Sequence, residues 1–292
     1  MNIFTFDIEE WYVEKHFREG SSERYQVYDR YLKMVLDLLD ETGTQGTFFC
    51  VGGLANEFGN VVRTIADRGH EIGCHSNEHR WLDGLTRREM KEDTERAVKS
   101  LEDLIGCKVV SYRAPAFSIG KGNKWAFEVL AECGIERDAS VYPAVREFGG
   151  FEDFGAAEPV VIKIGDVVMK EFPVSLVSFG HRRMAYSGGG YFRVLPLGFV
   201  KSVMRKKNYN MAYFHITDIE YHPYKMISRY AYEKYYMREG TFRNRFVRMM
   251  KRCTGSKGAF DKMCSLVRNF DFLSIKEADG LIDWNVTKKI NL

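Results

Sequence analysis

Two histidines at a spacing suited to metal binding, His75 and His79, follow the strand-like residues 71–74. Residues four apart share one face of a helical turn, so this spacing predicts two imidazoles that can bind the same metal ion. A catalytic zinc ion usually has three protein ligands and one position open for water. We therefore expect a third ligand, a carboxylate, from another part of the chain. A histidine pair without metal is the alternative for this spacing when it stands alone.

Acidic side chains suited to that role lie in the first strand-like segment, which carries Asp7, Glu9 and Glu10. Neighbours along a strand point to opposite faces, so Asp7 and Glu9 are expected on one side and Glu10 on the other. Arg113 and His215 each end another strand-like segment. Catalytic residues of α/β barrels gather at the carboxyl ends of the strands, so we expect these side chains to converge. Such a set is suited to metal-assisted hydrolysis, which needs a metal, a base and an acid.

The elements that must position these residues alternate between strand-like and helix-like, which is typical of βαβ units. Predicted strands cover residues 2–8, 46–51, 71–74, 109–113, 139–142, 160–164, 167–172, 211–215 and 271–275. Predicted helices cover residues 28–41, 56–68, 86–105, 123–133, 197–206, 225–252 and a last segment from 276. The third of these helices begins with a capping box, Thr86 and Glu89. We expect one domain over residues 1–292, with an irregular β insert at about 144–196 that contains a glycine-rich turn at 187–193.

The composition of the 292-residue chain excludes several classes of protein. Its net charge is only +3, which does not indicate nucleic-acid binding. The six cysteines are scattered singly, so neither a zinc ribbon nor a redox pair is predicted, and free thiols favour a reducing compartment. No secretory leader precedes the first predicted strand, and no apolar run approaches about 18 residues. We therefore expect a cytoplasmic protein.

Residues 225–262 form a basic, aromatic and helix-like stretch, with eleven Lys and Arg side chains against three acids. A solvated helix face is one interpretation of this stretch. The other is docking on an anionic membrane surface or on a pyrophosphate-linked glycan, which would make the protein peripheral to the inner membrane. Nucleic acid is not favoured, because no binding motif accompanies the charge. His181 and His222 have no partner signal and are expected at the surface or in turns.

Five short motifs occur in order along the chain. They are residues 5–10 (Thr-Phe-Asp-Ile-Glu-Glu), 75–79 (His-Ser-Asn-Glu-His), 113–116 (Arg-Ala-Pro-Ala), the aspartate at 138 and residues 213–215 (Tyr-Phe-His). With these motifs the chain resembles the NodB-like polysaccharide deacetylases, carbohydrate esterase family 4, from residue 2 to about residue 275. The first motif resembles the branch with an Asp-x-Glu-Asp/Glu-Trp opening, which is found beside polysaccharide and O-antigen biosynthesis genes.

The resemblance implies a role for each acid and imidazole in the first two motifs. Asp7 takes the position of the catalytic base. Glu9, His75 and His79 take the positions of the ligands of a divalent metal, with Zn²⁺ as the expected ion. Glu10 stays open as the alternative ligand, because the first motif of the family usually ends in two adjacent aspartates.

The later motifs imply the remaining catalytic groups. Arg113 would keep Asp7 ionised and oriented, since a nearby cation lowers the pKa of a carboxylate. The family has tyrosine where this chain has Ala116, but its backbone N–H would still donate to the developing oxyanion. His215 would be the acid, and Asp138 would pair with it and raise its pKa.

The family resemblance also implies a fold and an activity. The fold is a distorted (β/α) barrel, and the activity is the metal-dependent removal of an N-acetyl group from an amino sugar of a surface polysaccharide or its precursor. Trp11 and Tyr142 are expected as groove walls on which sugar rings stack, or else as core residues. The substrate would be an N-acetylated glycan or a lipid-linked or nucleotide-linked sugar. The alternatives are hydrolysis of a cyclic amide, as in allantoinase-like relatives, and a glycan-binding relative without catalysis.

Overall fold

One nine-stranded sheet, with the strand order β10-β1-β2-β3-β4-β5-β7-β6-β11, organises the fold. The computed structural model describes residues 1–18, 20–180, 182–223 and 225–292. The strands of the sheet are β1 (Asn2–Ile8), β2 (Thr47–Cys50), β3 (Glu71–Cys74), β4 (Ser111–Tyr112), β5 (Arg137–Asp138), β6 (Val160–Ile164), β7 (Val167–Glu171), β10 (Asn210–His215) and β11 (Lys289–Asn291). Neighbours from β10 to β7 are all parallel, so their carboxyl ends lie at one edge of the sheet. Strand β6 is antiparallel to β7, and β11 is parallel to β6.

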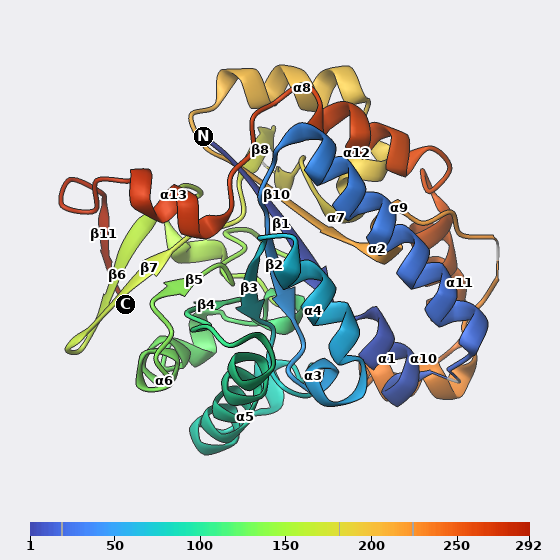
Figure 1. The fold of residues 1–292 in the computed structure, drawn as a ribbon, viewed down its shortest axis with the longest axis horizontal. Helices are drawn as coiled ribbons and strands as arrows, with labels where there is room; N and C mark the ends of the chain where they lie inside the picture. Colours follow the sequence, from blue (N-terminus) through green and yellow to red (C-terminus); the bar gives the residue numbers. More distant parts are fainter. Residues whose placement is uncertain (19, 181, 224) are drawn as a thin grey trace.

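Helices surround this sheet, as Figure 1 shows. They are α1 (Glu10–Phe17), α2 (Ser22–Thr42), α3 (Gly53–Glu57), α4 (Gly59–Asp67), α5 (Arg87–Ile105), α6 (Ala126–Glu132), α7 (Gly189–Val194), α8 (Leu197–Lys206), α9 (Ile216–Ile219), α10 (Arg229–Tyr236), α11 (Phe242–Cys253), α12 (Ala259–Val267) and α13 (Ile275–Leu281). Short 3₁₀ turns span Leu82–Gly84, Pro115–Phe117, Lys121–Asn123 and Glu152–Phe154. The predicted α/β architecture is confirmed, and α5 begins with the predicted capping box at Thr86 and Glu89.

Hydrophobic side chains pack on both faces of the sheet. Phe48 belongs to the large cluster that joins the sheet to the helices, whereas its neighbour Phe49 belongs to a smaller cluster on the other face. The smaller cluster brings Ile3 of β1 together with Phe172, which directly follows β7. These two strands are five positions apart in the sheet, so the sheet must curve around this cluster. The curvature agrees with the predicted distorted (β/α) barrel.

The chain after β7 returns to β10. Ser175 Oγ accepts a hydrogen bond from the Met211 N–H at 3.0 Å, and Ser187 Oγ donates to the Met211 carbonyl at 2.8 Å. Gly188 then passes so close to Tyr213 that a Cβ would clash with the tyrosine carbonyl. This glycine therefore permits a close approach to β10. A separate hairpin, β8 (Leu176–Phe179) and β9 (Arg182–Ala185), lies in the same segment.

Two predictions for this segment are wrong in detail. Two strands assigned to an irregular insert, β6 and β7, belong to the main sheet, because their apolar residues pack in its core. The predicted glycine-rich turn at 187–193 instead leads into helix α7. Strands from the first and the second half of the chain thus share one sheet, which supports our proposal of one domain.

Other departures follow from ambiguous local patterns. Helix α1 is not predicted, because the run Trp11-Tyr12-Val13 resembles a continuation of the first strand. The predicted helix 225–252 is two helices, α10 and α11, and the predicted strand 271–275 is a single bridge between Leu273 and Ile3. His222 is buried rather than at the surface, and His181 lies outside the described residues.

Among the residues described, none of the helices combines the length and the apolar character that crossing a membrane requires.

Candidate active site

The loop after β3, which carries His75 and His79, is not helical. Ser76 and His79 have φ angles of 59° and 55°, in the left-handed region that α-helices do not use. A hydrogen bond from the Asn77 N–H to Asp93 Oδ2 at 2.7 Å holds this loop. The premise that the two histidines share a helical face is therefore wrong. A turned loop brings their side chains together instead.

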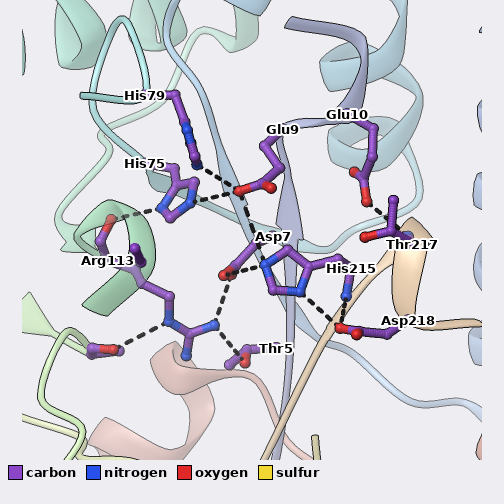
Figure 2. Close-up of polar contacts among 12 residues, drawn as sticks. Thr5, Asp7, Glu9, Glu10, His75, His79, Arg113, His215, Thr217 and Asp218 are labelled. Carbon is purple, nitrogen blue, oxygen red and sulfur yellow. Dashed lines mark hydrogen bonds and ion pairs between the residues drawn. The ribbon is translucent and has the colours of Figure 1, made fainter. Parts of the chain in front are cut away.

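Glu9, His75 and His79 bring three ligand atoms within 4.8 Å of one another. Glu9 Oε2 lies 2.6 Å from His79 Nε2 and 3.4 Å from His75 Nε2. Both buried Nε2 atoms lack a hydrogen-bond partner among the described residues. His75 Nδ1 donates to the Arg113 carbonyl at 2.7 Å, so the Nε2 lone pair faces Glu9, as Figure 2 shows. This orientation is typical of a metal-binding histidine, and two imidazoles with one carboxylate fit a catalytic divalent metal.

Glu9, and not Glu10, faces this cluster. The prediction of this orientation assumed that Glu9 and Glu10 continue strand β1. The strand ends at Ile8, and Glu9 is the N-cap residue of α1, so alternation along a strand does not explain the orientation. Glu10 Oε1 instead accepts a hydrogen bond from the Thr217 N–H at 2.9 Å. Burial opposes ionisation of Glu9, yet His79 and His215 outweigh it and hold the pKa of Glu9 well below its usual value. Burial and the charge of Glu9 raise the pKa of Glu10 to about 7.

Arg113 is fully buried and crosses the interior from the end of β4 to β1. Its Nη1 donates to Asp7 Oδ1 at 2.8 Å and to Thr5 Oγ1 at 2.9 Å, while Nε donates to the Ala139 carbonyl at 3.1 Å. One oxygen of Asp7 is thereby fixed. The other, Oδ2, lies 3.5 Å from His215 Nε2.

His215 ends β10 and is oriented by Asp218. Its Nδ1 contacts Asp218 Oδ2 at 2.8 Å, and Arg193 Nη1 donates to Asp218 Oδ1 at 2.9 Å. Burial opposes the charging of His215, but Glu9 and then Asp218 outweigh it and raise the pKa of His215 well above its usual value. His215 in turn lowers the pKa of Asp218 against the effect of burial. The arrangement favours a protonated imidazole beside Asp7.

Asp138 is not the partner of His215, which corrects the sequence prediction. Ser140 Oγ donates to Asp138 Oδ1 at 2.6 Å, and the Ser140 N–H donates to Oδ2 at 3.0 Å. Burial and the neighbouring Asp138 raise the pKa of Glu171 well above its usual value. The true partner, Asp218, could have been found from its position three residues after His215, where an acid caps the first turn of a helix.

Ala116 has a φ of 55°, and none of the described residues accepts a hydrogen bond from its N–H.

Trp11 and Tyr142 are each 1% exposed, which contradicts the prediction that they form groove walls. Trp11 Nε1 donates to Asp29 at 3.0 Å, and the Tyr142 hydroxyl accepts from the Ala185 N–H at 3.0 Å. Both are core residues.

Other aromatic residues lie beside the metal-binding cluster, and the sequence analysis missed them. The Tyr235 ring is 6.0 Å from the His79 ring and nearly parallel to it, with 14° between the planes. Trp81 lies 6.2 Å from Tyr235 and 4.9 Å from Phe148. These rings come from three segments that are far apart in the sequence, so local patterns do not connect them.

Two family models together match most of the chain. Residues 18–137 match the family described as polysaccharide deacetylase, and residues 139–279 match a domain of unknown function (DUF3473). The peptidoglycan-N-acetylglucosamine deacetylase of Bacillus cereus is 33% identical over 95 residues, which are 32% of this chain and 34% of that protein. An uncharacterized protein of Bacillus subtilis, YlxY, is 30% identical over 104 residues, 36% of this chain and 32% of that protein. The matches thus span about a third of each of these curated relatives.

Two solved structures share the fold. A protein of Mycobacterium smegmatis that is assigned as a polysaccharide deacetylase has a TM-score of 0.63 at 18% identity, over 100% of this chain and 92% of that chain. The 4-alpha-glucanotransferase of Thermococcus litoralis has a TM-score of 0.62 at 12% identity, over 100% of this chain and 41% of that chain. Since these two proteins have different named activities, the shared fold does not select an activity. Residues 18–137 are thus similar to polysaccharide deacetylases, and the two solved structures show the shared fold.

Proposed function

We propose that the protein is a metal-dependent hydrolase that removes the N-acetyl group from an amino sugar of a polysaccharide or its precursor. The observation that carries this proposal is the convergence of the Glu9–His75–His79 cluster, the Asp7–Arg113 pair and the His215–Asp218 pair at one edge of the sheet. The match of residues 18–137 to polysaccharide deacetylases supports the same reaction class.

Glu9, His75 and His79 would hold the divalent ion, and we propose Zn²⁺ because two imidazoles and one carboxylate are a common catalytic zinc set. A divalent ion there would polarise the amide carbonyl and lower the pKa of water as a Lewis acid. The Arg113 carbonyl fixes the His75 ring, and therefore the direction in which its lone pair points.

We propose that Asp7 acts as the general base. Arg113 holds Oδ1 at 2.8 Å, which orients the carboxylate and leaves Oδ2 free to accept a proton. Water attacks the acetyl carbon, and its proton passes to Asp7 Oδ2. The N–H of Ala116, which has no partner among the described residues, would donate to the oxygen that gains negative charge.

We propose that His215 acts as the general acid. Asp218 accepts from Nδ1, so Nε2 carries the proton that is transferred, and this nitrogen lies 3.5 Å from Asp7. The C–N bond breaks as Nε2 gives its proton to the sugar nitrogen. The products are acetate and a free amino sugar, and Asp7 then returns its proton to solvent or to His215.

We further propose that the reaction takes place in the cytoplasm, on a lipid-linked or nucleotide-linked sugar. All six cysteines are free thiols, which supports a reducing compartment. Acetate-release assays on a lipid-linked and on a nucleotide-linked sugar would distinguish these two substrates.

Acetate release from N-acetylated oligosaccharides tests the proposal, with protein purified without chelator and with its metal content measured. Asp7→Asn should retain the metal and lose about 10²–10⁴-fold in rate, the usual contribution of a positioned proton-transfer group. A variant that holds metal and releases acetate at the parent rate would show that Asp7 is not the base. Hydrolysis of cyclic amides without acetate release, or sugar binding without turnover, would replace the proposed reaction.

A further inference from the structure

Helix α11 (Phe242–Cys253) presents apolar side chains to solvent. Phe242 is 66% exposed, Phe246 43%, Val247 45% and Met250 38%. Phe242, Phe246 and Met250 are spaced four apart and form one stripe along the helix, and the first two rings lie 6.1 Å apart and nearly parallel. A helix of a globular protein normally turns such a stripe toward the core.

The inner face of the same helix carries arginines instead. Arg245 Nη1 donates to the Ile227 carbonyl at 3.2 Å, and Arg248 Nε donates to the Tyr236 hydroxyl at 2.6 Å. Arg252 Nε lies 3.4 Å from His222 Nε2. Three cations thus attach α11 to the protein while the apolar stripe faces away. This inverted orientation leaves the stripe without a partner within the described chain.

Exposed apolar side chains are concentrated around this helix. Sixteen large apolar side chains are exposed among the described residues, and seven of them lie between residues 221 and 250. In Figure 1, α11 lies at the periphery of the molecule, on the side opposite β6 and β11. A concentration of this kind on one surface indicates an interaction site, because isolated exposed apolar residues are spread more evenly.

The positive charge around the apolar stripe of α11 indicates an anionic partner. Arg243 is exposed on the same helix, and Lys225 and Lys257 are exposed on the flanking segments; none of them forms an ion pair within the described part of the chain. Residues 225–262 carry eleven basic and three acidic side chains. A second copy would meet this surface with the same positive charge, so self-association is disfavoured. An anionic lipid bilayer offers both the opposite charge and an apolar interior.

We propose that α11 docks the protein on an anionic lipid bilayer, with Phe242, Phe246 and Met250 inserted at the level of the headgroups and Arg243 in contact with lipid phosphates. The docking surface is connected to the candidate active site. Arg248 of α11 binds the hydroxyl of Tyr236, and the neighbouring Tyr235 stacks on His79. Docking through α11 would therefore place the site near the bilayer. The proposal does not depend on the deacetylase reaction.

Vesicle co-sedimentation tests this proposal with the full chain and two kinds of vesicle, phosphatidylcholine alone and phosphatidylcholine with 30% phosphatidylglycerol (about a third anionic lipid). The parent protein should bind the anionic vesicles and lose binding at high salt. Phe242→Glu/Phe246→Glu should reduce the partition coefficient on the order of a hundredfold, since two aromatic anchors are replaced by charges that the bilayer repels. Arg243→Glu should reduce it at least about fivefold.

Phe179→Glu is the matched control, because Phe179 is 70% exposed on the β8–β9 hairpin, outside α11. This variant should bind vesicles like the parent, and circular dichroism should show that all variants are folded. Sedimentation-velocity measurements without lipid should show a monomer. A dimer that Phe242→Glu/Phe246→Glu abolishes would show that a second copy covers the stripe, and would overturn the proposal. Parent-like vesicle binding by that variant, or no binding by the parent, would also overturn it.

Discussion

At the amino ends of β2 to β5 the first residues have polar side chains that are paired with one another, whereas at the carboxyl ends several buried polar atoms have no partner among the described residues. Thr47, Glu71, Ser111 and Arg137 are the first residues of β2, β3, β4 and β5. Glu71 accepts hydrogen bonds from Ser111 at 2.6 Å, Thr47 at 2.6 Å and Arg137 at 3.2 Å. Arg137 also donates to Asp279 at 3.1 Å. None of these five side chains has a buried polar atom without a partner among the described residues.

The carboxyl ends of the same sheet show the opposite pattern. Buried atoms without a hydrogen-bond partner among the described residues include Nε2 of His75, both ring nitrogens of His79 and Oε2 of Glu10. A buried polar atom without a partner costs stability, so several of them at one place indicate a ligand site. The comparison supports our proposal that one end of the sheet contributes mainly to stability and that the other serves binding and catalysis.

Removal of the two histidines should have the largest effect on activity. His75→Ala/His79→Ala should lower the metal content from about one ion per chain to none, and the rate by roughly 10⁴-fold, because the Lewis acid is lost. The unfolding temperature without metal should also fall, because His75→Ala deletes the buried hydrogen bond from Nδ1 to the Arg113 carbonyl. Elemental analysis, acetate release and calorimetry measure the three quantities. Full metal retention by the double variant would remove the metal assignment.

The choice between the two neighbouring acids has a separate test. Glu9→Ala should weaken metal binding much more than Glu10→Ala, since Glu9 Oε2 faces both histidines and Glu10 binds the Thr217 N–H. Loss of a ligand typically exceeds the 10–100-fold effect of an outer residue. Metal titration by calorimetry gives both affinities. The opposite order would make Glu10 the ligand.

At the amino ends, Glu71→Ala should affect stability and leave chemistry unchanged. Removing one partner of a buried ion pair typically costs about 3–5 kcal/mol, and the loss should be at the lower end of this range because Arg137 keeps its contact with Asp279. Urea denaturation measures this loss, and Glu71→Gln, which keeps one of the two side-chain oxygens as an acceptor, should lose less. Metal content and rate per folded molecule should match the parent. Impaired chemistry in the folded fraction would break the comparison between the two ends.

The partner of the acid histidine can be identified by pH dependence. His215 must be protonated to act as acid, and Asp218 helps to raise its pKa, so Asp218→Asn should lower that pKa. The alkaline limb of the kcat/KM profile should then move to lower pH, and the rate should fall about tenfold at the parent optimum. Asp138→Asn is the control, since Asp138 binds Ser140 and should leave the limb in place. A shift with Asp138→Asn alone would restore the pairing predicted from sequence.

Substitution of His70, which precedes β3, should have the smallest effect on activity, and its test is the pH dependence of stability. Burial lowers the pKa of His70 to about 4, while an unfolded histidine has a pKa of about 6.5. The unfolded state therefore binds the proton more tightly, and stability is lost as the pH falls from about 6.5 to 4. The difference of about 2.5 between these two pKa values corresponds to a loss of at most roughly 3 kcal/mol, which urea denaturation at several pH values would measure and which should be smaller in His70→Gln. An equal loss in both proteins would mean that other groups cause the acid sensitivity.

Much of the sheet and several site residues can be predicted from the sequence, because the end of a strand is marked by residues close to it in the chain. Asp7, His75 and Arg113 follow or end apolar strand-like runs, and the structure brings them together at the same edge. The reasoning for His75 and His79 was wrong in its premise, since a loop with two left-handed residues replaces the expected helix. Backbone choices of this kind depend on contacts with distant segments.

Partners supplied across the fold could not be predicted. Arg193, which binds Asp218, comes from the glycine-rich segment that was expected to be a turn. Tyr235 reaches His79 from the basic and aromatic stretch 225–262, for which the sequence predicts no contact with the site. Trp11 has the same aromatic character as a groove wall, but its position on the inner side of α1 places it in the core. Sequence type alone does not distinguish these two environments.

Arg113 serves the two halves of the site through chemically different parts of one residue. Its backbone carbonyl orients His75, and its guanidinium holds Asp7. A substitution at this position deletes the guanidinium but keeps the carbonyl, because every amino acid has one. If the site works as we propose, metal binding depends on the path of the chain at residue 113, and proton transfer depends on the identity of its side chain. During evolution, the second property can be lost by a single codon change while the first is inherited intact.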